Sequence, residues 1–309
     1  MRRREFIAGG VAATQARAGD YLHTHGFHSL YNLDYDQAIE AFEAESKQDA
    51  EGDAHNNLGS ALLYRALFRA DALDGKVALS VAEFLHKPKV AIATEDRNRL
   101  LRALDRGEEI ARGNVAKNPK NANALYTLGA SFVHRANLAL LADKDWRKAL
   151  KAGGEARTLH TQALELDRGL IDAMLVPSVH EYIVGSLPIF LRALGFLMGF
   201  SGDKEKGLAG LRTVASKGTR AKLEAELVLA LVERREGRPE LALPIMQRLK
   251  QEYPVNHLYR REVANLLLDM TLKDEARREF AQLGDARYKF LKPTSLEAYK
   301  REFEARLRA

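Results

Sequence analysis

The chain has 309 residues, of which 46% are hydrophobic and 29% charged, and its formal net charge is +6. The absence of cysteine excludes a disulfide framework, a cysteine nucleophile and thiolate metal sites. Alanine and leucine are abundant, there are only 8 prolines, and no long run has the alternation of a strand, so the composition favours helix.

Residues 1–18 have the composition of an export signal. Three arginines at positions 2–4 precede a short apolar stretch over residues 6–13, and residues 16–18 read Ala-Arg-Ala, a small-x-small cleavage pattern. Residues 3–7 resemble the twin-arginine signal of bacteria, which has two arginines, any residue, phenylalanine and an aliphatic residue. Cleavage here predicts a periplasmic or exported protein. The alternative is a frayed N-terminal helix, and the protein is then cytoplasmic.

From residue 19 onward, the apolar residues recur as pairs of helices with a small residue in the first helix of each pair. The first unit has Gly26 in one helix and Phe42 in the next. The second unit opens with Leu58-Gly59 and the third with Leu128-Gly129. A fourth, less regular unit extends over residues 171–218. A small residue is expected where two antiparallel helices cross closely, and large residues fill the gaps between units.

The last two units align at a distance of 34 residues. Five apolar positions correspond: Leu229 to Val263, Ala230 to Ala264, Ala242 to Ala276, Met246 to Phe280 and Leu249 to Leu283. This period and the helix–turn–helix layout resemble the tetratricopeptide repeat (TPR) family. The resemblance covers most of residues 19–284, with insertions near residues 71–94 and 138–152.

The resemblance implies an all-α superhelical solenoid of about six antiparallel helix pairs, because one unit cannot bury its own apolar face and must stack on its neighbours. Residues 285–309 follow the repeats as a C-terminal segment. Within it, Leu296, Tyr299 and Phe303 fall on one side of an amphipathic helix, which is expected to cap the stack.

The apolar segment 182–200 is about long enough to cross a bilayer. Pro188, Arg192 and three glycines interrupt it, and a spanning helix with Arg192 near its centre is costly. We expect two short helices, broken before Pro188 and buried in the solenoid. The alternative is an exported protein that uses this segment to contact a membrane or another envelope component.

No pattern typical of an enzyme, metal site or cofactor site is present in the sequence. His25 and His28 share a helical face, but His23 does not, and no motif fixes a carboxylate beside them. The carboxylate pairs Glu108-Glu109 and Glu224/Glu226 are expected to be solvated, because residues at these spacings diverge on a helix. Lysine and arginine are interleaved with glutamate, which argues against nucleic acid as a partner.

The resemblance implies that a protein or peptide partner lies along the first helices of the units, in the concave groove. The groove residues predicted in this way are His23, Asn56, Tyr64, Tyr126, His134, Arg235, Arg261 and Asn265. Arg261 and Asn265 resemble half of a clamp for a peptide carboxylate, whereas Leu227 stands where the other half is needed. The sequence therefore predicts a non-catalytic scaffold or adaptor that binds a peptide or a helix. The identity of that partner is not encoded in these motifs.

Overall fold

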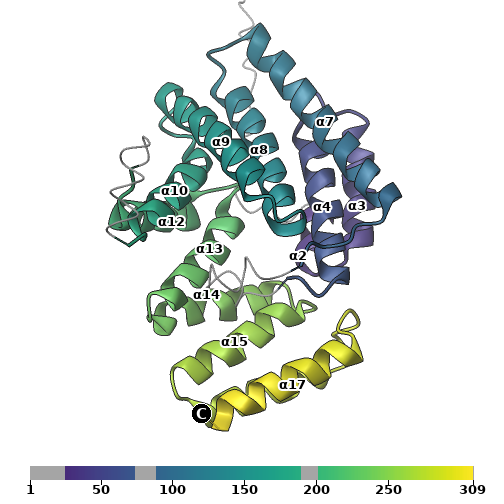
Figure 1. Cartoon of the computed structure of the whole chain (residues 1–309), viewed down its shortest axis with the longest axis vertical. Helices are drawn as coiled ribbons and strands as arrows, with labels where there is room; N and C mark the ends of the chain where they lie inside the picture. Colours follow the sequence, from purple (N-terminus) through teal and green to yellow (C-terminus); the bar gives the residue numbers. More distant parts are fainter. Residues whose placement is uncertain (1–24, 74–87, 189–200, 309) are drawn as a thin grey trace, which may run out of the picture.

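The computed structural model describes residues 25–73, 88–188 and 201–308, and every regular element within these ranges is a helix. The helices form six consecutive pairs and one further helix at the C-terminal end (Figure 1). The pairs are α2 (His25–Tyr31) with α3 (Tyr35–Ser46), α4 (Asp53–Arg69) with α7 (Thr94–Lys117), α8 (Ala122–Asn137) with α9 (Trp146–Leu166), α10 (Leu175–Gly185) with α12 (Lys204–Lys217), α13 (Lys222–Arg235) with α14 (Pro239–Glu252), and α15 (His257–Asp269) with α16 (Lys273–Ala281). The predicted all-α array of helix pairs is confirmed. The N-terminal segment 1–18 and His23 lie outside the described residues.

The small residues of the first helices lie where the two helices of a pair cross. A Cβ atom added to Gly26 would lie 2.5 Å from the Phe42 ring, and one added to Gly59 would lie 2.4 Å from a Leu104 methyl. Neither distance is tolerable for real atoms, so glycine sets the closeness of α2 to α3 and of α4 to α7. The large partner residue in the second helix fills the space that the glycine leaves, which gives each pair its fixed crossing.

Several helices begin at a residue whose side chain accepts a hydrogen bond from the first turn. These N-cap residues are Asp34 before α3, Asn121 before α8, Asp145 before α9, Asp203 before α12 and Asn256 before α15. Each such side chain satisfies one backbone N–H that the helix itself leaves unpaired. The turns between helices therefore follow from short local sequences.

The two predicted insertions contact each other. Residues 138–142 form a π-helical turn (η1, Leu138–Ala142) that continues α8, and Val90 donates its backbone N–H to the Ala142 carbonyl at 2.9 Å. Arg97 also bonds Asp143 at 2.8 Å. Residues 74–87, in the first insertion, lie outside the described residues. The described part of the first insertion thus contacts the second at Val90.

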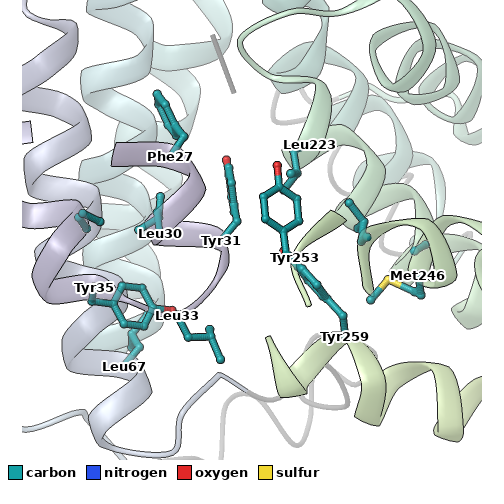
Figure 2. Close-up of a cluster of buried hydrophobic side chains, with 14 of the residues drawn as sticks. Phe27, Leu30, Tyr31, Leu33, Tyr35, Leu67, Leu223, Met246, Tyr253 and Tyr259 are labelled. Carbon is teal, nitrogen blue, oxygen red and sulfur yellow. The ribbon is translucent and has the colours of Figure 1, made fainter. Parts of the chain in front are cut away.

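The first and last units of the array pack against each other. The largest buried cluster joins side chains of α2, α3, α4 and α7 to side chains of α13 through α17. At its centre the Tyr31 and Tyr253 rings lie 5.4 Å apart, facing each other from opposite ends of the sequence (Figure 2). Asn256 donates its side-chain N–H to the Tyr31 carbonyl at 2.7 Å, and Val255 donates its backbone N–H to the Asn32 side chain at 3.2 Å. The array is therefore closed on itself, which the repeat pattern did not predict.

The C-terminal helix α17 (Pro293–Arg308) covers the last pair, as predicted. Phe303 stacks on Phe280 of α16 with ring centroids 4.1 Å apart. Near the start of α17, Ser295 donates its hydroxyl to Asp71 at 3.0 Å, at the end of α4. The helix therefore caps the last unit and also ties it to the second unit.

The apolar segment is described only in part. Helix α10 ends at Gly185, before Pro188, as the sequence predicts. The expected burial is wrong for two of the segment's described residues, because Ile183 and Leu187 are exposed. Residues 189–200 lie outside the described residues. Among the residues that the structure describes, no helix combines the length and apolarity that a membrane span requires.

Candidate functional site

The predicted groove residues occupy equivalent positions in successive first helices. In the first, second, third and fifth units the crossing residue is followed at the fifth position by a large polar or aromatic side chain; these crossing residues are Gly26, Gly59, Gly129 and Ala230. This outer row consists of Tyr31, Tyr64, His134 and Arg235. A second row precedes the crossing residue and includes Asn56, Tyr126 and Arg261. The side chains of the two rows differ in what they contact.

The second row is occupied by contacts within the chain. Asn56 is 1% exposed and donates to the Thr127 carbonyl at 3.3 Å. Tyr126 is also buried and stacks on His160 of α9 with ring centroids 5.0 Å apart. These two residues join α4 to α8 and α8 to α9, so they hold the helices together in this conformation.

The C-terminal helix occupies the predicted half-clamp. The Arg261 guanidinium lies 4.2 Å from the centroid of the Tyr299 ring, a cation–π contact. Arg306 donates to the Asn265 side-chain oxygen at 2.6 Å. The guanidinium and the amide predicted to grip a carboxylate therefore contact α17 in this structure. The sequence predicts α17 as a cap, but it does not predict the contacts of α17 with Arg261 and Asn265.

Glu224 lies at the closure of the array, where Tyr31 donates its hydroxyl to Glu224 Oε1 at 2.5 Å. The other carboxylate oxygen, Oε2, is buried and has no hydrogen-bond partner. Burial raises the pKa of Glu224 above its ordinary value, because it disfavours the charged form. The expectation that Glu224 and Glu226 are solvated is wrong. The two side chains do diverge, but closure covers Glu224, and Glu226 is buried beside Arg248 of α14.

A second polar contact joins units of the array that are far apart in sequence. Asp53, at the start of α4, accepts hydrogen bonds from the Thr127 hydroxyl at 2.9 Å and from Arg220 at 3.2 Å. Arg220 also lies over the Tyr126 ring, 5.6 Å from its centroid. Burial raises the pKa of Asp53, although Arg220 acts in the opposite direction. The repeat motif gives no signal for this cluster, because Asp53 and Arg220 are 167 residues apart.

Three predicted residues of the outer row form no side-chain hydrogen bond or ion pair with the residues that the structure describes. Tyr64 is half-buried, and burial raises the pKa of its hydroxyl to about 12. His134 has a buried Nδ1 without a hydrogen-bond partner, and burial lowers the pKa of its ring to about 4. Arg235 is exposed and forms no ion pair with any residue that the structure describes. A phenol, a neutral imidazole and an exposed guanidinium thus occupy equivalent positions in units two, three and five, respectively.

The other histidines of the N-terminal region have local contacts. His55 Nδ1 lies 2.8 Å from Asp49, and His28 Nε2 lies 3.2 Å from the Asn32 amide. Within the described ranges, no group of three or more histidine, aspartate or glutamate side chains is placed to hold a metal ion.

His160 makes the stability of the third unit sensitive to acid. Its Nε2 donates to the Tyr126 carbonyl at 3.2 Å, the side chain is 3% exposed, and burial lowers the pKa of the ring from 6.5 to about 4. The unfolded chain therefore binds a proton that the folded chain excludes, and stability present above pH 6.5 is lost as the pH falls toward 4. We expect a loss of up to about 3 kcal/mol from this residue.

The variant His160→Leu isolates this effect, because Leu104 occupies the equivalent crossing in the second unit. Urea denaturation midpoints measured across this pH range should fall less steeply for the variant than for the natural chain. Equal pH dependence in the two proteins would show that His160 is not the acid-sensitive group.

No protein-family model matches the chain, and no curated protein matches it. Among solved structures, the chain is similar to TTC0263, a thermophilic TPR protein of Thermus thermophilus, with 18% identity, 78% of this chain and 94% of that chain covered, and a TM-score of 0.41. It is also similar to yeast Tom70, with 12% identity, 91% of this chain and 72% of that chain covered, and a TM-score of 0.35. The fold is TPR-like, as the crossings and helix pairs described above show independently.

Proposed function

We propose that this protein is a non-catalytic scaffold that holds a peptide or helix of a partner protein along the outer row Tyr64, His134 and Arg235. One observation carries the proposal: His134 keeps a buried ring nitrogen that nothing in the described part of the chain bonds. A buried polar atom without a partner costs free energy, and a partner that supplies the matching hydrogen-bonding group recovers it.

The three side chains define the chemistry of that partner. The neutral His134 imidazole has one donor and one acceptor nitrogen, so its unpaired nitrogen suits a backbone C=O or N–H of the bound segment. Arg235 offers a guanidinium that can bind a carboxylate through two parallel bonds. Tyr64 adds an aromatic surface with a hydroxyl donor. The row therefore suits a segment with an acidic residue near Arg235 and exposed backbone near His134.

Site-specific photocrosslinking tests this proposal. A photoreactive phenylalanine analogue placed at Tyr64 or at Arg235 in cells is expected to crosslink the same partner protein. The control position is Arg102 on α7, which is exposed and lies outside the two rows. Crosslinks of equal strength from Arg102, or different proteins captured at Tyr64 and Arg235, would contradict a shared inner site.

A matched substitution then tests the ring nitrogen. We expect His134→Phe to keep the fold, because the pocket already holds a neutral ring, and to reduce crosslinking at Tyr64 several-fold by removing one hydrogen-bonding group. Unchanged crosslinking in a folded His134→Phe protein would show that the nitrogen plays no part in binding.

A further inference from the structure

The first turns of α9 present two large apolar side chains to solvent. Trp146 is 52% exposed and Leu150 is 61% exposed, and they stand one helical turn apart. Single exposed apolar residues are common on protein surfaces, but an adjacent tryptophan and leucine form a continuous apolar surface. Gly153 and Gly154 continue it along the helix. We call these four residues the α9 face.

The α9 face continues the stripe on which the next unit packs. Positions 146, 150, 153 and 157 repeat at the spacing of one helical side. At the far end of this stripe Arg157 lies 2.9 Å from His180 of α10, so α10 covers that end. Because α10 ends at Gly185, no helix that the structure describes covers the α9 face. The stripe thus has the geometry of a surface between two repeat units, and no helix of the described ranges covers its first half.

The two glycines of the α9 face have no packing reason within the described chain. A Cβ atom added to Gly153 or Gly154 would have nothing within 4 Å. Glycine inside a helix costs roughly 1 kcal/mol relative to alanine. Elsewhere in the chain, helical glycines such as Gly26 and Gly59 let a second helix approach closely. The same function explains Gly153 and Gly154 if a helix outside the described chain lies against them.

The charge beside the α9 face is positive. Arg147 and Lys151 are exposed along one edge, and neither forms an ion pair within the described ranges. The Arg147 guanidinium lies 5.3 Å from the centroid of the Trp146 ring. A helix that covers the α9 face would place its edge beside these two cations, which favours aspartate or glutamate there.

We propose that the α9 face binds an amphipathic helix of a partner protein, with an apolar side against Trp146 and Leu150 and an acidic edge beside Arg147 and Lys151. The helix occupies the place that a longer first helix of the fourth unit would take. This surface is separate from the outer row Tyr64, His134 and Arg235, so the inference does not depend on the function proposed for that row.

The fluorescence of Trp146 tests the inference directly, because it is the only tryptophan in the chain. The probes are two synthetic helical peptides of leucine with glutamate or of leucine with lysine, identical in pattern and opposite in charge. We expect the glutamate peptide to cause a saturable blue shift of the emission and to slow its quenching by acrylamide. The lysine peptide is expected to have no effect.

Three variants locate the binding. We expect Leu150→Glu to weaken it by at least tenfold, since it puts a charge at the centre of the apolar surface. Gly153→Leu should weaken it similarly by blocking close approach, although leucine favours helix. The control is Leu166→Glu, which changes a leucine that is 46% exposed at the opposite end of α9, and it should bind the peptide normally.

Several results would overturn the inference. These are equal responses to both peptides, normal binding by the Gly153→Leu protein, or a response to vesicles of anionic phospholipid without one to the glutamate peptide. A Trp146 emission that is already blue-shifted and slowly quenched in the free protein would show that the chain itself fills the surface. Loss of crosslinking at Tyr64 leaves all four outcomes unaffected, so the two proposals fail separately.

Discussion

Replacing Tyr253 with alanine is expected to lower the free energy of unfolding by about 3 to 5 kcal/mol, the range measured for large buried aromatic residues. Tyr253 is fully buried and lies between the two ends of the array (Figure 2). Its ring contacts Tyr31 at 5.4 Å and Tyr259 at 6.2 Å, measured between centroids. The loss should therefore reach the first unit as well as the last two.

Hydrogen exchange followed by mass spectrometry separates local from shared destabilisation. In the Tyr253→Ala protein we expect faster exchange in α2 and α3 as well as in α14 and α15, while α8 and α9 change less. The matched control is Leu241→Ala in α14, whose side chain is 45% exposed and which should cost less than about 1 kcal/mol. Faster exchange confined to α14 and α15 would mean that the closure does not couple the two ends.

The second large effect concerns two glycines with opposite surroundings. A Cβ atom added to Gly207 of α12 would lie 2.4 Å from the Tyr182 backbone nitrogen and 2.7 Å from the Ser178 carbonyl. Backbone atoms cannot move aside as a flexible side chain does, so Gly207→Ala is expected to destabilise the protein by about 3 kcal/mol. Gly153→Ala has open space and should stabilise the protein by up to about 1 kcal/mol.

Denaturant titrations of both variants check this prediction, since the same chemical change must act with opposite sign. If both changes destabilised the protein, the conclusion that Gly153 has open space for a methyl group would be wrong. If both changes stabilised the protein, the conclusion that α12 packs too closely on α10 to admit a methyl group at Gly207 would be wrong. This pair also bears on the α9 face, because it measures the helix stability that the glycine at position 153 costs the free protein.

The repeat pattern predicted the helix pairs because it records contacts between residues that are near in sequence. Gly26 and Phe42 belong to one unit, and a small residue followed by a large one in the next helix is visible in the sequence itself. The C-terminal cap was predictable for a similar reason, since Leu296, Tyr299 and Phe303 repeat at a helical spacing. In each case the periodicity of the apolar residues contains the information.

The closure could not be predicted in this way, because it pairs residues that share no period. Tyr31 and Glu224 are separated by 193 residues, and their bond depends on the summed rotation between all the intervening units. The prediction of the candidate site was affected most by these contacts between distant residues. Arg261 and Asn265 resemble a carboxylate clamp by sequence, whereas the path of the chain brings α17 over both of them.

The closed array also restricts how this protein can change in length. A repeat array with two free ends can gain or lose a unit with little effect on the others, since each unit contacts only its neighbours. Here one added or deleted unit would rotate Tyr253 away from Tyr31 and separate the two halves of the largest buried cluster. The number of units is therefore fixed by geometry, and variation in length is confined to the loops and insertions.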